Sequence, residues 1–116
     1  NDIFALDLSK RDTSPAMQSY ADLTEFIIRY PESEYIDAAR ERLIFLRNLI
    51  ASSELDGAEY YMKRGAYLAA VNRANYVLKN IPNSTERERA LRILKEAYKQ
   101  LGYDEYAEKI SSFETN

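Results

Sequence analysis

The spacing of apolar side chains predicts helices along nearly the whole chain. In the segment that opens with Ser14 and Pro15, apolar residues recur at intervals of three and four, as on one face of an α-helix. Serine at the N-cap followed by proline in the first turn is typical of a helix start. Pro31 ends the segment, because the residue before a proline avoids the α conformation. We therefore expect a helix at residues 15–30.

The next apolar series keeps its phase for an unusual length. Its spacings of three and four continue through residues 36–60, and Ser33 can cap its start. One helix at about residues 35–64 is a better explanation than two shorter helices. The alternative is a kink at Ser52–Gly57, since a glycine inside a helix costs about 1 kcal/mol relative to alanine.

The stretch AEYYMKRGAYLAAVNRANYVLKNIPNS, at residues 58–84, predicts a helical hairpin. Gly65 lets the first helix end, because only glycine takes a positive φ without steric cost. Ala70 and Ala74 are small, so the returning helix at residues 66–81 can approach the first helix closely. The inward face of that helix is expected to comprise Ala66, Ala70, Ala74, Val77, Leu78 and Ile81, and the solvent face Asn72, Arg73, Asn75 and Lys79.

Two more helices are predicted after Pro82. Thr85 and Glu88 match a capping box for a helix at about residues 86–101, which Gly102 ends. A last amphipathic helix follows and carries Tyr103, Tyr106, Ala107, Ile110 and Phe113.

The order of Tyr61, Gly65, Tyr67, Ala70 and Pro82 matches the tetratricopeptide (TPR) repeat, a helix–turn–helix unit of about 34 residues. The chain is therefore predicted to be all-α, with about five helices in TPR hairpins stacked in a right-handed superhelix. By domain, we expect an irregular segment of a truncated repeat at 1–14, which carries Ile3, Phe4, Leu6 and Leu8, the TPR domain at 15–113 and a frayed tail at 114–116.

The composition narrows the classes of function that the chain can have. The chain has 116 residues, and its 16 basic and 19 acidic side chains are interspersed, so no basic tract points to nucleic acid or an anionic membrane surface. No apolar run approaches the roughly 18 residues of a membrane span. Because cysteine and histidine are absent, disulfides, thiolate zinc sites and catalysis by either residue are excluded. We expect neither an enzyme nor a bound cofactor or metal.

Tyrosine is unusually frequent, with ten residues and no tryptophan. Most tyrosines in helical proteins pack with the ring half-buried, although tyrosine is also enriched in protein interfaces. Tyr60 and Tyr61 point about 100° apart on a helix, so one of them must be partly exposed. Arg73, between small residues, is either solvated or able to make a two-pronged contact with a partner carboxylate. Arg64 suits the negative end of a helix dipole.

Several stretches resemble one family closely. They are AEYYMKRGAYLAAVNRANYVLKNIPNS, MQSYADLTEFIIRYPESEY, AARERLIFLRNLIASSELDGAEYY and ERALRILKEAYKQLGYDEYAEKI, which together cover nearly the whole chain. The combination of AEYY, RGAY and VNR at this spacing is its specific part. The sequence resembles the BamD family of outer-membrane assembly lipoproteins, also called ComL or YfiO. The resemblance implies the carboxy-terminal TPR half of such a protein, starting within its third repeat.

The family implies a non-enzymatic scaffold on the periplasmic face of the bacterial outer membrane, lipid-anchored in the full-length protein. It would dock to the membrane-proximal POTRA domain of BamA and support folding and insertion of outer-membrane proteins, with a BamE-like lipoprotein as a further candidate partner. The arginine of VNR is a contact position in the family and corresponds to Arg73. The expected partner-binding residues are Arg73, Asn72, Tyr60, Tyr61, Arg64 and Tyr76. The alternative function is a generic TPR adaptor that binds an extended peptide of another partner.

Overall fold

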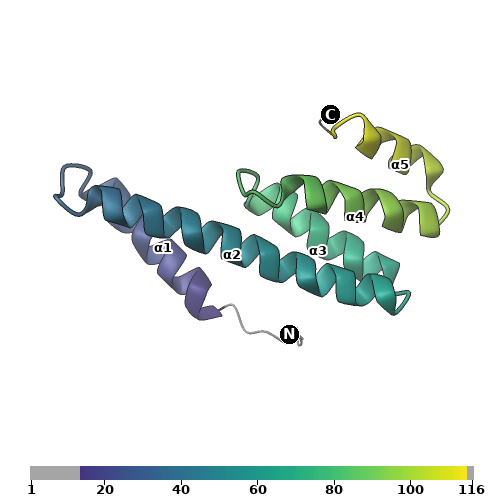
Figure 1. Cartoon of the computed structure of the whole chain (residues 1–116), viewed down its shortest axis with the longest axis horizontal. Coiled ribbons are helices and arrows are strands. Elements are labelled where there is room, and N and C mark those ends of the chain that lie inside the picture. Colours follow the sequence, from purple (N-terminus) through teal and green to yellow (C-terminus); the bar gives the residue numbers. More distant parts are fainter. Residues whose placement is uncertain (1–13, 115–116) are drawn as a thin grey trace. The chain divides into compact units, whose positions relative to one another are not determined.

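The computed structural model describes residues 14–114, which form helices joined by short turns and contain no strand. The expected apolar segment Ile3–Leu8 lies outside the described residues. The predicted all-α fold with five helices is confirmed (Figure 1). The helices are α1 (Ser14–Arg29), α2 (Ile36–Lys63), α3 (Tyr67–Asn80), α4 (Arg87–Gln100) and α5 (Asp104–Ser111).

The long helix predicted at 35–64 is confirmed by α2, which has 28 residues and continues through Ser52–Gly57. The chain divides into two compact units inside this helix, after Ile50. The first unit contains α1 and the beginning of α2. Its buried apolar residues, among those described, are Ala39, Leu46 and Ile50, all from α2.

The second unit, from Ala51 onward, contains the predicted hairpin. In this unit α4 packs against both α3 and α5 (Figure 1). The core is built of alanines and a few large aliphatic side chains, of which Leu55, Val77, Leu91 and Leu94 are the largest fully buried ones. Because alanines predominate where the helices meet, the backbones can approach one another closely, as expected for TPR-like hairpins.

Most of the predicted inward face of α3 is buried. Ala70, Ala74, Val77 and Ile81 are in the core, and Ala66 and Leu78 are half-buried. The structure corrects two details. Val71 is also buried, and Arg73 does not face solvent: only 20% of its side chain is exposed. Asn72, Asn75 and Lys79 are exposed as predicted.

The turns after α2 and α4 have the same hydrogen-bond pattern. In the first, Gly65 N–H donates to Met62 O (3.1 Å) and Ala66 N–H to Tyr61 O (2.9 Å). In the second, Gly102 N–H donates to Lys99 O and the next amide donates to the carbonyl five residues before it. Both are Schellman motifs, which require a left-handed residue after the helix. The glycines have φ values of 77° and 84°, so the predicted glycine ends are confirmed.

The turns after α1 and α3 form a second matching pair. The Ser33 N–H donates to Tyr30 O, and the Ser33 hydroxyl accepts from Tyr35 N–H at 3.0 Å. Ser84 does the same 51 positions later: its N–H donates to Ile81 O, and its hydroxyl accepts from Glu86 N–H at 3.2 Å. In each turn a serine hydroxyl thus binds the backbone two residues on, just before a helix.

This second pair corrects the predicted capping box. The N-cap of α4 is Glu86, not Thr85, and no side chain caps the helix at that position. The helix predicted at about residues 86–101 is nevertheless confirmed by α4, and Thr85 lies one residue before its N-cap. The same turn geometry places Ser33 before α2 rather than at its N-cap.

Candidate partner-binding site

Arg73 lies against α2 rather than in solvent. Its Nη1 is 3.5 Å from Glu54 Oε1, and the two side chains are 20% and 18% exposed. The guanidinium carbon is 5.6 Å from the centre of the Tyr61 ring, within range of a cation–π interaction. We call Glu54, Gly57 and Tyr61, all on α2, the Arg73 seat.

Gly57 explains how the guanidinium comes so near to α2. The glycine is buried, and a Cβ atom built on it would lie 2.6 Å from Arg73 Nη1. Any larger residue would therefore displace the end of the arginine side chain. The sequence presented Gly57 as a possible kink, whereas in the structure it is a point of close approach inside an unbroken helix. The sequence did contain a signal for this close approach, because the apolar spacing of the helix continues through Gly57 without interruption.

Burial controls the electrostatics of the seat. Removal from water raises the pKa of Glu54 above its ordinary value, and the charge of Arg73 offsets this only in part. Burial, followed by the negative charge of Glu54, raises the pKa of Tyr76. Tyr76 therefore keeps its hydroxyl proton at physiological pH. Glu54 is thus the carboxylate that links two of the predicted site residues, Arg73 and Tyr76.

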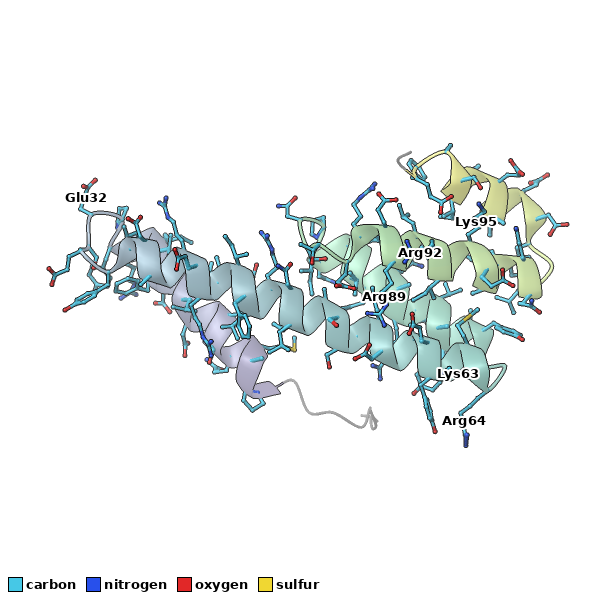
Figure 2. All side chains as sticks on the ribbon, in the orientation of Figure 1. Glu32, Lys63, Arg64, Arg89, Arg92 and Lys95 are labelled. Atoms are coloured by element: carbon cyan, nitrogen blue, oxygen red, sulfur yellow. The ribbon has the colours of Figure 1, made fainter. Side chains whose placement is uncertain are left out.

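The remaining predicted residues differ in position. Tyr60 is 44% exposed and meets the Tyr61 ring edge-on, with ring centres 5.7 Å apart. This confirms that one tyrosine of the pair is partly exposed. Arg64, at the end of α2 (Figure 2), has its guanidinium carbon 5.0 Å from the Tyr60 ring centre. Asn72 is exposed on α3. The structure therefore places Glu54 and Tyr61 beside Arg73, and Tyr76 within the electrostatic reach of Glu54. Tyr60 contacts Tyr61, and Arg64 lies over Tyr60.

The sequence did not reveal a second arginine cluster in the same unit. Arg89 of α4 (Figure 2) contacts three carboxylates: Asp56 at 2.8 Å, Glu59 at 3.0 Å and Glu86 at 3.1 Å. The hydrogen bond to Glu59 is the main reason that the pKa of Arg89 is raised. These acidic partners all belong to the chain itself, and two of them are on α2. Arg89 therefore ties α4 to α2. Its two partners on α2 are about 30 residues away in sequence, too far for any local pattern to predict.

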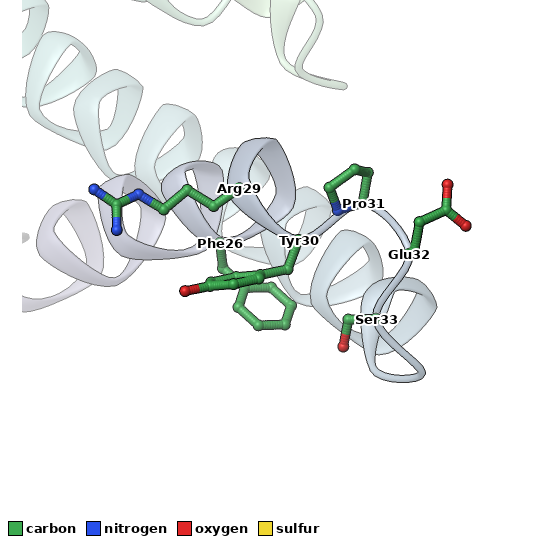
Figure 3. Close-up of a pocket in the computed structure, with 6 residues that line it drawn as sticks. All are labelled: Phe26, Arg29, Tyr30, Pro31, Glu32 and Ser33. Atoms are coloured by element: carbon green, nitrogen blue, oxygen red, sulfur yellow. The ribbon is translucent and has the colours of Figure 1, made fainter.

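Two open cavities lie elsewhere in the described chain. One, of about 450 Å³, is in the first unit at the end of α1 (Figure 3). Its lining comprises Phe26, Arg29, Tyr30, Pro31, Glu32 and Ser33. There Arg29 is paired with Glu25 of its own helix at 3.2 Å. The other, of about 480 Å³, lies at the start of α5 and is lined by residues 102–106.

Between residues 14 and 114, no group of three or more acidic side chains is placed to hold a metal ion. No helix in the same range has the length and apolarity needed to cross a membrane. The second unit presents a mostly buried guanidinium over the half-buried ring of Tyr61, with the partly exposed Tyr60 next to that ring.

The fold defines the chain as an all-α protein of TPR-like helical hairpins. Residues 2–113 match the YfiO family, described as outer membrane lipoprotein, and the chain belongs to this family. The predicted family membership is thereby confirmed.

Curated relatives carry the name outer membrane protein assembly factor BamD. The protein from Vibrio cholerae is 35% identical over 109 residues, which is 94% of this chain and 45% of the relative. The protein from Xylella fastidiosa strain 9a5c is 40% identical over 100 residues, covering 86% of this chain and 34% of the relative. The protein from Neisseria meningitidis serogroup A is 36% identical over 107 residues, covering 92% and 40%. The chain thus spans less than half the length of these relatives, which are named as assembly factors and not as enzymes.

Proposed function

We propose that this chain is the non-enzymatic docking part of an outer-membrane protein assembly factor. It binds the membrane-proximal POTRA domain of BamA on the periplasmic face of the outer membrane, in a protein held there by a lipid anchor. Family membership and the names of the relatives support the assembly role. A BamE-like lipoprotein is proposed as a further partner.

The observation that carries the docking proposal is the environment of Arg73. Its guanidinium is partly desolvated, with a 20% exposed side chain, and lies over the Tyr61 ring. A guanidinium in such surroundings binds a partner carboxylate more strongly than a fully solvated one, because less water must be removed. Tyr60, which is partly exposed and meets the Tyr61 ring edge-on, adds an aromatic contact of the kind that is enriched in interfaces.

The test is a calorimetric titration of the chain with the membrane-proximal POTRA domain of BamA. We expect Arg73→Glu to weaken binding at least tenfold, since the reversed charge would repel the partner carboxylate that the arginine binds. Arg73→Ala should weaken it less, and raised salt should weaken the wild-type complex.

The matched control is Arg92→Glu, which reverses the charge of an exposed arginine on α4 (Figure 2). Circular dichroism would confirm that each variant is folded. Equal binding by wild type and by a folded Arg73→Glu variant would contradict docking through Arg73. If folded wild type failed to bind the POTRA domain, the docking proposal itself would be wrong.

A further inference from the structure

The guanidinium of Arg73 has a defined orientation on α2. Measured from the position of a Cβ atom on Gly57, Nη1 lies at 2.6 Å, the guanidinium carbon at 3.4 Å and Nε at 4.0 Å. Nη1 is therefore the nitrogen that points at the helix, and it is the same nitrogen that pairs with Glu54. Because the guanidinium is planar, fixing Nη1 against α2 also restricts where its other nitrogens can lie.

Such restriction matters for a two-pronged contact. A carboxylate that binds an arginine through two parallel hydrogen bonds needs one edge of the guanidinium in a fixed plane. A free arginine has many rotamers, and ordering them on binding weakens the complex. An arginine that is already held by its own protein avoids much of this loss.

Two side chains of the seat act on the arginine in different ways. Glu54 supplies the opposite charge, and its carboxylate is itself mostly buried, with 18% of the side chain exposed. Gly57 supplies space, because a Cβ atom at this position would come too close to the end of the Arg73 side chain. Neither residue was among those expected from the sequence to contact a partner.

We infer that Glu54 and Gly57 are positioning residues that hold Arg73 in the orientation in which it receives a carboxylate of the partner. This inference rests on the proposed docking function. It adds that affinity depends on two residues of α2 that themselves need not touch the partner. Glu54 thus orients Arg73 for the partner carboxylate and does not compete with that carboxylate for the arginine.

The test measures binding of the same POTRA domain by Glu54→Gln and Gly57→Ala. Each variant loosens the arginine in a different way, one by removing the charge and the other by filling its space. We expect each to raise the Kd about threefold to tenfold, the range that corresponds to ordering one long side chain. Glu59→Gln is the matched control, since it removes a charge from the same helix, where Glu59 binds Arg89 rather than Arg73.

A double-mutant cycle separates positioning from a general structural effect. In an Arg73→Ala background, Glu54→Gln and Gly57→Ala should no longer change the Kd, because there is no arginine left to orient. Thermal unfolding should show that neither single variant lowers the Tm by more than the control does. A persistent effect in the Arg73→Ala background would overturn the inference.

The outcomes also distinguish this inference from the docking proposal. If Arg73→Glu abolishes binding while Glu54→Gln and Gly57→Ala bind as wild type does, docking through Arg73 stands and the positioning role is wrong. If Glu54→Gln binds more tightly, Glu54 competes with the partner and the inference is equally overturned. If Arg73→Glu binds normally, both proposals fail.

Discussion

Glu54 is a carboxylate whose charge is disfavoured by its surroundings, even though an arginine lies beside it. Burial outweighs the attraction of Arg73, so the pKa in the folded state is above the ordinary value of 4.5. An acid whose pKa rises on folding stabilises the fold when it is protonated and loses that contribution as the pH rises through the folded-state pKa. The fold thus carries a cost at neutral pH in order to hold Arg73.

This cost predicts a pH dependence for Glu54→Gln. The uncharged amide resembles the protonated acid, so the free energy of unfolding of the variant relative to wild type should increase as the pH rises from 4.5 toward neutrality. Urea unfolding followed by circular dichroism at several pH values would measure the difference. A difference that stays constant across this range would show that Glu54 does not titrate above its ordinary pKa in the folded protein.

The site was only partly predictable from residue types. Arg73 was predicted from its small neighbours and from the VNR of the resembled family, and Tyr60 and Tyr61 because adjacent helical residues cannot both face the core. The burial of Arg73 was missed, because its position among polar residues on α3 suggested a solvent face. Whether a polar side chain reaches water depends on what the neighbouring helix leaves empty, and that was decided by Gly57, a residue 16 positions earlier.

At the scale of helices, Arg89 adds ion pairs to the apolar packing that holds α4. It is 21% exposed and meets carboxylates on α2 and at the start of its own helix. We expect Arg89→Ala to lower the free energy of unfolding by about 1–2 kcal/mol, because three acidic groups lose their shared cation. Chemical denaturation would measure this.

Arg89→Lys is the informative companion variant. A lysine keeps the charge but offers one nitrogen in place of the guanidinium fork, so it should recover only part of the loss. Full recovery by lysine would mean that charge alone matters there. No loss in Arg89→Ala would show that the three carboxylates tolerate one another in solvent.

The helices themselves were more predictable than the contacts between them. Regular apolar spacing and the two left-handed glycines are local signals, and both α2 and the Schellman turns followed from them. The start of α4 was predicted to within one residue, and only the N-cap differs, since it is Glu86 and not Thr85. The division of the chain inside α2 has no local signal, since the helix continues across it.

For the whole molecule, the two units differ in how much they bury. Along α1, no residue from Pro15 to Arg29 is fully buried, whereas α4 buries Ala90, Leu91, Ile93, Leu94 and Ala97. Local opening is easier where fewer apolar contacts must be broken. We therefore expect the backbone amides of α1 to exchange with deuterium faster than those of α4, as hydrogen-exchange mass spectrometry would measure.

Exposed apolar side chains in the first unit agree with the prediction of faster hydrogen exchange there. Ile28 is 73% exposed and Phe45 is 54% exposed.

Binding of the POTRA domain through Arg73, which belongs to the second unit, should slow hydrogen exchange in α3 and leave exchange in α1 unchanged. Protection of α1 by the POTRA domain would mean that the contact extends beyond the second unit.

The alternating turns have a consequence for how such chains can be rebuilt. Each junction, the turn between two consecutive helices, is specified by a few consecutive residues. These include a proline and a serine after α1 and α3, and a glycine after α2 and α4. The hydrogen bonds of each junction join residues within five positions of one another, so we expect each junction to keep its geometry when it is moved. A repeat could therefore be removed or duplicated between two junctions of the same kind, and the order and direction of the helices on either side would be preserved.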